Sequence, residues 1–464
     1  MLKYCFLLVC CCLLLISGRL QAQTPESDSN TCRYLKSIHI EGALKTRHAV
    51  ILRELNTREG DCIPIDSMEA VAQVSRLRLM NIQLFNEVQV HWQPLSADSL
   101  EMQIRVYERF PVIPDPVVEF ADRNFNVWWS EQQHDLRRIN LGLALVHRNF
   151  RGNREQISVL GQVGYTQKVG IAYERPFIDR QQKHGAGISF YGIQNREIAY
   201  RTDSNKLSFY RSSTHAMLRQ AELSAWYTYR PQYASIHKLS LSYQHYWISN
   251  VIANMNPEYL GRGEKEEDIL TLNYLYKYNG VDNWEYPLTG TRIVGSLQQQ
   301  FALKNKYAQS RIYLQADRYW HAGKKWYMSL VFRGKISFPQ TQPYIFQKNM
   351  GYDYDYVRGY EYYVIDGSSF ALLRATLKRE LLNVKVHLPI RYFQVIPLRI
   401  YPKIYADAGG AYNAHPYNDY LYNKMLYSAG VGLDVVTLYD IKIRIEYTFN
   451  GLGENGLYLH KSGE

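Results

Sequence analysis

Apolar and polar residues alternate along almost every segment of the chain from residue 138 onward. Near the C-terminus, for example, Ile441 and Tyr447 mark the ends of an apolar series at every second position. The positions between them are Lys442, Arg444 and Glu446. A period of two is that of a β-strand with two different faces. Because one face is repeatedly charged, these strands are not buried on both sides, and a barrel with an apolar outside and a polar inside fits them.

Sixteen antiparallel strands are predicted from this alternation, eleven before a long segment Tyr352–Gly367 and five after it. The predicted strands are 139–147, 154–164, 167–175, 185–194, 198–211, 218–230, 236–250, 268–279, 289–301, 307–319, 325–338, 368–382, 398–412, 426–436, 440–449 and 456–460. The fifth of these is interrupted by Asp203-Ser204-Asn205. We therefore expect a mainly β protein with a 16-stranded antiparallel transmembrane β-barrel over residues 138–464.

The residues before the barrel have a different pattern, in the order strand, helix, helix, strand, strand. Ile38 and Ile40 belong to the first strand, and Thr46 and Asp66 are placed to cap the two helices. Two alternating strands follow Phe85. This predicts a small α+β domain over residues 33–109. Three prolines after it predict a stiff linker over residues 110–137.

The N-terminus has the pattern of a secretory signal. Lys3 precedes an apolar run from Cys5 to Ile16, and cleavage after Ala22 would remove a signal peptide of residues 1–22. Two cysteines then remain, Cys32 and Cys62. In an oxidising compartment they form either one disulfide or two reduced, partly buried thiols.

Composition supports a membrane barrel over the alternative of an aromatic-rich soluble sandwich. The chain has 40 Tyr and 8 Trp, the residues that form belts at membrane–water interfaces. A mean hydropathy of −0.35 excludes a bundle of membrane helices. The net charge of +11 comes without a dense basic run, so we assign the excess to a polar lumen or to anionic lipid, and expect no nucleic-acid partner.

Catalytic and cofactor motifs are not evident. Gly451–Gly456 fits a dinucleotide fingerprint, but only eight residues follow it, so no helix can hold a pyrophosphate and a turn is expected. Glu380, Asp407 and Glu446 face inward and could be imagined as a hydrolase site. Charged side chains are ordinary on the wall of a polar lumen. We therefore predict a protein that is not an enzyme, with no cofactor and no metal.

The motif Val357-Arg358-Gly359-Tyr360 lies in the long segment between the predicted strands. An arginine attached to a membrane barrel is costly unless a carboxylate receives it. By strand parity, Glu380 and Asp407 both point inward on adjacent strands. They could give Arg358 charge-assisted, bidentate hydrogen bonds. The alternative is an ordinary external loop with an exposed arginine.

These residues resemble a known family. The four-residue motif, together with Tyr405-Ala406-Asp407-Ala408-Gly409, is similar to the loop latch of the BamA/TamA-type outer-membrane assembly and translocation superfamily, also known as the bacterial surface antigen family. Residues 33–109 resemble its POTRA domain. The resemblance implies that Arg358 folds into the lumen onto acidic groups. It also implies a barrel in the outer membrane of a Gram-negative bacterium, with one POTRA domain in the periplasm.

The resemblance further implies a function. The protein would insert, assemble or translocate other proteins by β-augmentation, at the edge of the POTRA sheet and at the barrel seam where first and last strands meet. Its partners would be unfolded outer-membrane or secreted client proteins, outer-membrane lipids and accessory periplasmic or lipoprotein subunits. Two alternatives remain open, a dedicated two-partner-type exporter of one client protein and a passive outer-membrane pore.

Overall fold

The computed structural model describes residues 32–387, 395–414, 420–437 and 442–460. The predicted signal peptide 1–22 lies outside the described residues. The chain divides into two compact units. One contains the residues up to 113 together with 147–156, and the other contains residues 114–146 and 157–464.

The first unit contains the predicted α+β domain. Its elements are β1 (Cys32–Glu41), α2 (His48–Glu54), β2 (Cys62–Pro64), a short 3-10 turn (Ile65–Ser67), α3 (Met68–Asn81), β3 (Phe85–Pro94) and β4 (Ser99–Glu108). The sheet order is β2-β1-β4-β3, with β1 and β4 parallel. Leu100, Met102 and Ile104 alternate inward along β4 and are almost fully buried. Ala72 and Leu79 of α3 are also buried, and their spacing of seven residues places them on one face of the helix.

A disulfide joins Cys32 of β1 to Cys62 of β2, with the Cα atoms 5.6 Å apart. Closing a loop of this length stabilises a domain by about 3–4 kcal/mol in the chain-entropy model. We expect no free thiol when the mature protein is unfolded without reductant, and easier urea unfolding of the domain once reductant is added. Two thiols that titrate in the non-reduced, unfolded protein would contradict the bridge.

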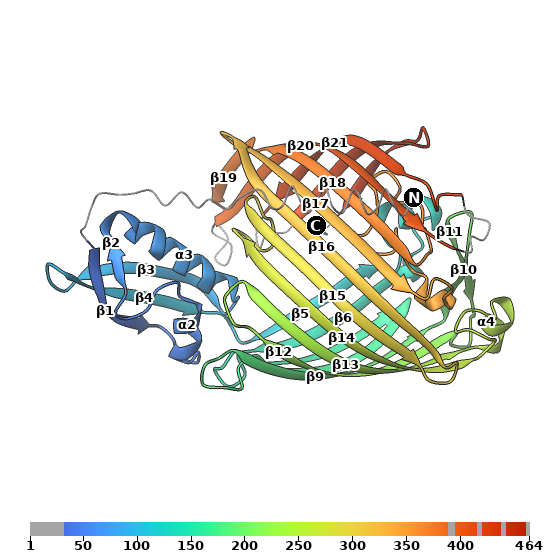
Figure 1. Cartoon of the computed structure of the whole chain (residues 1–464), viewed down its shortest axis with the longest axis horizontal. Helices are drawn as coiled ribbons and strands as arrows, with labels where there is room; N and C mark the ends of the chain where they lie inside the picture. Colours follow the sequence, from blue (N-terminus) through green and yellow to red (C-terminus); the bar gives the residue numbers. More distant parts are fainter. Residues whose placement is uncertain (1–31, 388–394, 415–419, 438–441, 461–464) are drawn as a thin grey trace. The chain divides into compact units, whose positions relative to one another are not determined.

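The second unit is a closed antiparallel barrel (Figure 1). Its strands are β5 (Val112–Phe120), β6 (Ile139–Arg148), β7 (Gln156–Gly164), β8 (Thr166–Arg175), β9 (His184–Asn195), β12 (Leu218–Tyr229), β13 (Ser235–Ile248), β14 (Glu266–Val281), β15 (Gly290–Ala302), β16 (Tyr307–Gly323), β17 (Trp326–Phe338), β18 (Ser369–Arg379), β19 (Leu382–His387), β20 (Val395–Tyr412), β21 (Leu426–Val436), β22 (Lys442–Asn450) and β23 (Asn455–His460). Between them lie β10 (Glu197–Asp203), β11 (Lys206–Arg211), α4 (Asn250–Met255) and short helical turns at Val127–Glu131, Leu136–Arg138 and Tyr344–Phe346. The order β12 through β23 continues into β5 through β9 and closes.

The predicted fold class is confirmed, with one difference in the strand count. The sheet has 17 assigned strands. However, β18 pairs with residues 403–412 of β20, and β19 pairs with residues 395–400 of the same strand. The two therefore share one place beside β20, so the seventeen strands fill sixteen places around the barrel.

Two predictions about which segments form the barrel are wrong. The predicted strand 198–211 is a separate two-stranded sheet, β10–β11. Ser204 and Asn205 both adopt positive φ, of 53° and 60°, and so turn the chain back on itself. The predicted linker 110–137 contains β5, which is the first barrel strand. Pro114 and Pro116 suggested a linker because proline has no N–H to donate to a neighbouring strand. Proline is nevertheless tolerated in edge strands and at β-bulges.

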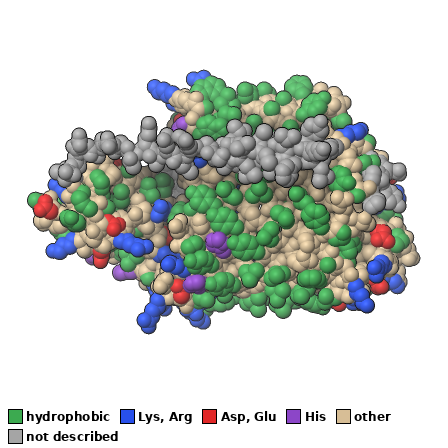
Figure 2. All heavy atoms as spheres, viewed as in Figure 1, with side chains coloured by type: hydrophobic (Ala, Val, Ile, Leu, Met, Phe, Trp, Pro, Cys, Tyr) green, Lys and Arg blue, Asp and Glu red, His purple; other side chains and the backbone are tan. Residues whose placement is uncertain are grey.

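The barrel has an apolar outer face and a charged inner face. Leu141, Leu143 and Leu145 of β6 are about half exposed, whereas the inward Arg374 and Glu446 are almost fully buried. Figure 2 shows hydrophobic side chains gathered over the outer wall of the barrel strands. Exposed apolar surface of this extent is typical of a wall that faces lipid. In the described part of the chain, no helix has the length and hydrophobicity to span a membrane.

We expect the purified barrel in detergent to be heat-modifiable. Its backbone hydrogen bonds form one closed ring, so the unboiled protein should remain folded in dodecyl sulfate and migrate differently from the boiled protein. Electrophoresis with and without boiling measures this directly, beside a far-ultraviolet circular dichroism spectrum. Identical migration with a mainly helical spectrum would contradict the fold.

Candidate functional site

The loop between β17 and β18, residues 339–368, packs against the inner wall of the barrel. We call it the latch loop. Four of its apolar side chains, Met350, Val357, Tyr360 and Ile365, are buried in one cluster. The rest of the cluster comprises Phe370, Leu372, Ala411 and Leu426 of the wall strands and Leu421 of the connection between β20 and β21. The apolar contacts thus hold the loop at the wall on either side of Arg358.

Arg358 is bound to Asp407 of β20 at three points. Its Nε donates to Asp407 Oδ2 at 2.8 Å, its Nη2 donates to Oδ1 at 2.6 Å, and its backbone N–H donates to Oδ2 at 3.1 Å. The exposed fractions of the two side chains are 2% and 0%. This is the bidentate fork geometry that gives arginine and carboxylate their strongest hydrogen bonds. The structure therefore brings together Arg358 and Asp407, two of the residues predicted from the sequence.

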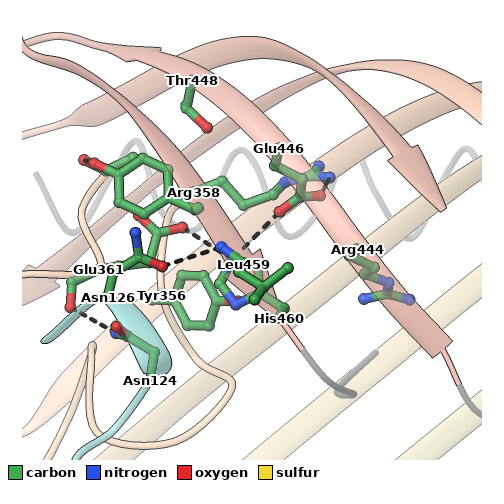
Figure 3. A network of polar contacts seen from close by, with 12 residues as sticks. Asn124, Asn126, Tyr356, Arg358, Glu361, Arg444, Glu446, Thr448, Leu459 and His460 are labelled. Carbon is green, nitrogen blue, oxygen red and sulfur yellow. Dashed lines mark hydrogen bonds and ion pairs between the residues drawn. The ribbon is translucent and has the colours of Figure 1, made fainter. Parts of the chain in front are cut away.

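The remaining edges of the Arg358 guanidinium group also have partners. Nη1 lies 3.4 Å from Glu446 Oε1 of β22, and Nη2 donates to Thr376 Oγ1 of β18 at 3.2 Å. The guanidinium carbon lies 3.8 Å from the centroid of the Tyr405 ring, a cation–π contact. Side chains from three strands thus surround Arg358, which Figure 3 shows beside Glu446 and Thr448.

Glycines allow the loop to approach the wall closely. Gly359 has a φ of 87°, which other residues rarely adopt, and a Cβ atom there would lie 2.8 Å from Thr448 Cγ2. Its carbonyl oxygen accepts a hydrogen bond from Asn450 Nδ2 at 2.8 Å. On the wall, a Cβ atom at Gly409 would lie 3.1 Å from Val357 Cγ2. The spacing of Asp407 and Gly409 therefore provides an acceptor for Arg358 and space for its neighbour.

The carboxylates that receive Arg358 belong to a larger network of buried charges. Asp407 Oδ2 also lies 3.8 Å from Arg374 Nε. Glu446 also contacts Lys403 Nζ at 2.7 Å and His460 Nε2 at 3.4 Å. Paired in this way, the buried charges avoid the large cost of an isolated ion. The same pairing means that removing one member leaves others uncompensated.

Glu380, predicted as the second partner of Arg358, does not reach it. Its carboxylate accepts hydrogen bonds from Asn383 Nδ2 at 3.2 Å and from the Tyr401 hydroxyl at 3.4 Å. The strand register pairs Arg374 with Asp407. Glu380 follows Arg374 by six residues, which is about 20 Å along a strand. Parity along the strand assigned Glu380 to the inner face but could not give its level along the barrel axis. The second carboxylate that contacts Arg358 is that of Glu446.

One signal in the sequence pointed to Glu446, its position two residues after Arg444 on the same inward face of β22 as Lys442. Its proximity to Arg358 depends on the stagger of the strands β20, β21 and β22, in which Gly432 lies between Lys403 and Glu446. Alternation along one strand carries no information about that stagger.

The arrangement is an electrostatic lock. No group of three His, Cys, Asp or Glu residues that could hold a metal ion occurs within the described ranges. Asp407 and Glu446, the acids around Arg358, are paired with basic side chains. The site therefore holds a loop in place, and its opening would expose charged groups of the wall.

Comparisons with known proteins found one family model and several solved structures similar to parts or all of this chain. Residues 33–109 match the POTRA family model, described as a surface antigen variable number repeat. A BamA from Haemophilus ducreyi lacking POTRA domains 1–3 has the same fold, with a TM-score of 0.52 and 13% identity over 92% of this chain and 83% of that one. CdiB from Acinetobacter baumannii aligns with a TM-score of 0.49 and 12% identity over 92% and 74% of the two chains. CdiB from Escherichia coli aligns with 0.49 and 10% over 94% and 92%. No curated protein matches the sequence.

The fold and the site thus define a transmembrane β-barrel protein that carries a POTRA domain and a loop locked to its inner wall. Residues 33–109 are similar to the POTRA family, and the chain shares its fold with the BamA of Haemophilus ducreyi.

Proposed function

We propose that this protein assembles or translocates other proteins at the outer membrane, with its POTRA domain in the periplasm. The observation that carries the proposal is the lock at Arg358, in which the latch loop is held by wall charges on several strands rather than left open to solvent. We infer that the loop works by changing between this held state and a released one. A passive pore has no need of them.

The POTRA sheet supplies a first surface for a client segment. Its outer strands are β2 and β3, of three and ten residues. β3 is therefore the longer free edge, and an extended client segment can add to it through backbone hydrogen bonds. Such binding depends little on client sequence, as a general assembly factor requires.

The barrel supplies a second edge at the seam. An unpaired strand edge in hydrocarbon leaves backbone groups without hydrogen bonds, at several kcal/mol for each group. When the seam parts, a client strand that pairs there removes this cost. Successive strands can then add until the client closes on itself, so the fold provides both the site and the driving force for assembly.

Depletion of the protein in its native cell tests the proposal. Quantitative mass spectrometry of the outer membrane and of the medium should show the loss of several barrel proteins from the membrane. The loss of a single secreted protein would instead assign the protein as a dedicated exporter. Unchanged inventories, together with a steady conductance of the purified barrel, would support a passive pore.

A further inference from the structure

The hairpin β10–β11 is held at its base by buried charges. Arg138 donates to Asp122 through Nε at 2.9 Å and through Nη2 at 2.7 Å, and its Nη1 contacts Glu197 of β10. The guanidinium carbon also lies 4.4 Å from the centroid of the Phe209 ring of β11. Arg138 thus ties both strands of the hairpin to the connection between β5 and β6. Figure 1 shows the hairpin at the same end of the barrel as α4.

Further contacts fix the middle of the hairpin against the latch loop. The Thr202 hydroxyl oxygen lies 3.2 Å from that of Tyr344 and 3.4 Å from that of Tyr352, both in the latch loop. Asn256, which follows α4, donates through Nδ2 to Tyr200 O at 2.6 Å. The hairpin is therefore a fixed support beside the loop.

Asn205, in the turn of the hairpin, binds the latch loop through its backbone and its side chain. Val364 N–H donates to Asn205 O at 2.8 Å, and Asn205 Nδ2 donates to Val364 O at 3.0 Å. Both residues have an exposed fraction of 0%. The next residue, Ile365, exchanges backbone hydrogen bonds with Met350 of the same loop, at 2.9 and 3.1 Å. Two successive residues of the loop are thus paired, one to the hairpin and one within the loop.

The Asn205 side chain also binds a third segment. Its Oδ1 accepts hydrogen bonds from Tyr420 N–H at 2.9 Å and from Leu421 N–H at 3.1 Å, in the connection between β20 and β21. A carboxamide can serve both segments because it has a donor and an acceptor. Backbone groups buried away from water need such partners. We call this set of hydrogen bonds the Asn205 pin.

The pin differs from the lock at Arg358 in place and in chemistry. Val364 follows Arg358 by six residues, on the other side of Gly359. The lock pairs opposite charges, whereas the pin consists of neutral hydrogen bonds to backbone groups. Breaking the ion pair with Asp407 leaves the bonds to Val364 in place. The two sets of contacts therefore hold two parts of one loop.

We propose that Asn205 is a positioning residue that holds the second arm of the latch loop, residues 361–367, so that the loop leaves the wall fully only when the Arg358 lock and the Asn205 pin both open. The inference rests on the proposed function, in which the loop changes between a held and a released state. The hairpin β10–β11 then has a task outside the barrel wall, since it carries the pin to the loop.

Hydrogen exchange of the purified protein tests the contacts of the pin. Asn205→Gly keeps the positive φ of the turn and removes the side chain, so the amides of Tyr420 and Leu421 should exchange about ten-fold faster. Asn205→Asp keeps the acceptor and should leave these two amides unchanged. Ser204→Gly, at the neighbouring position of the turn, is the matched control. Unaltered exchange in an Asn205→Gly protein that remains heat-modifiable would overturn the pin.

Chymotrypsin cleavage in vesicles, mapped by mass spectrometry, tests whether the loop is held in two parts. Asn205→Gly and Asn205→Asp both remove the donor to Val364 O, so cleavage after Tyr362 and Tyr363 should rise several-fold. Arg358→Ala should instead raise cleavage after Tyr354 and Tyr356, and the double variant should open both arms. Equal cleavage of both arms in each single variant would contradict two separate holds.

The folding of a client separates a positioning role from a merely structural one. The probe is a small outer-membrane barrel protein, denatured in urea and diluted onto vesicles of phosphatidylethanolamine and phosphatidylglycerol that contain each variant. Asn205→Gly should slow its folding several-fold although Arg358 and Asp407 are unchanged, and Ser204→Gly should not. An unchanged rate in an Asn205→Gly protein with a loosened arm would overturn the positioning role and leave the proposed function intact. If the unaltered protein folds the probe no faster than empty vesicles do, the proposed function itself fails.

Discussion

Replacing Arg358 with alanine should leave a folded barrel with a released latch loop and little client handling. Burying a charge whose partner has been removed costs about 3–5 kcal/mol. Here Asp407 would lose both side-chain hydrogen bonds from Arg358 and would keep Arg374, at 3.8 Å, and the backbone N–H of residue 358. The barrel ladder itself does not involve the Arg358 side chain. We therefore expect the cost to appear as loop release rather than as unfolding.

Arg358→Lys should restore little of the activity. A lysine ammonium group is a point charge and cannot serve Asp407 bidentately while also reaching Thr376 and Glu446. The flat stacking on the Tyr405 ring would also be lost.

Two measurements follow from these substitutions. One is complementation of a strain depleted of the protein, and the other is protease access to residues 340–367 in outer membranes. Lys348→Ala, an exposed change in the same loop, is the control and should behave as the unaltered protein. An Arg358→Ala protein that is fully active and equally protected from protease would show that the lock has no part in function.

The acidic partners of Arg358 should differ sharply in importance. Asp407→Asn should reproduce the loop release of Arg358→Ala, because it leaves two buried arginines, Arg358 and Arg374, without their shared carboxylate. Glu446→Gln should release the loop in part, since it removes the negative charge that Glu446 presents to Arg358 and Lys403. Glu380→Gln should have no effect, because Glu380 bonds to Tyr401 and Asn383 far along the wall.

Limited proteolysis of the three variants in outer membranes, with heat-modifiability as the check on folding, measures this order. Glu380→Gln is the matched control, an inward glutamate changed in the same way as Glu446. Loop release by Glu380→Gln equal to that by Glu446→Gln would contradict the register of β18 and β20.

Alternation along the chain was sufficient to predict the barrel because lipid and lumen impose opposite demands on successive residues. Alternation misled where a hairpin outside the barrel had the same pattern, and where prolines interrupted the pattern of a barrel strand. The hairpin β10–β11 alternates like a barrel strand. The turn at Ser204 and Asn205 folds it into a separate two-stranded sheet. β5 was missed because Pro114 and Pro116 argue against a barrel strand, although the structure places both within one.

The lock could be predicted only in part for a related reason. Parity gives the face of a residue, so Asp407 and Glu446 were both placed inward. The level of a residue in the barrel depends on strand stagger, which placed Glu446 beside Arg358 and Glu380 far from it. Asn126, which bonds to the backbone of Leu457 and Leu459 of β23, gave no signal in the sequence, because a single polar residue in a connection has no periodicity.

The most direct measurement is the folding rate of a defined client in reconstituted vesicles. A small outer-membrane barrel protein in urea is diluted onto vesicles that are empty, that contain the mature protein, or that contain Arg358→Ala. The folded fraction is followed by its heat-modifiable migration. We expect clearly faster folding with the unaltered protein than with Arg358→Ala or empty vesicles. Equal rates in all three would contradict a latch-dependent assembly function.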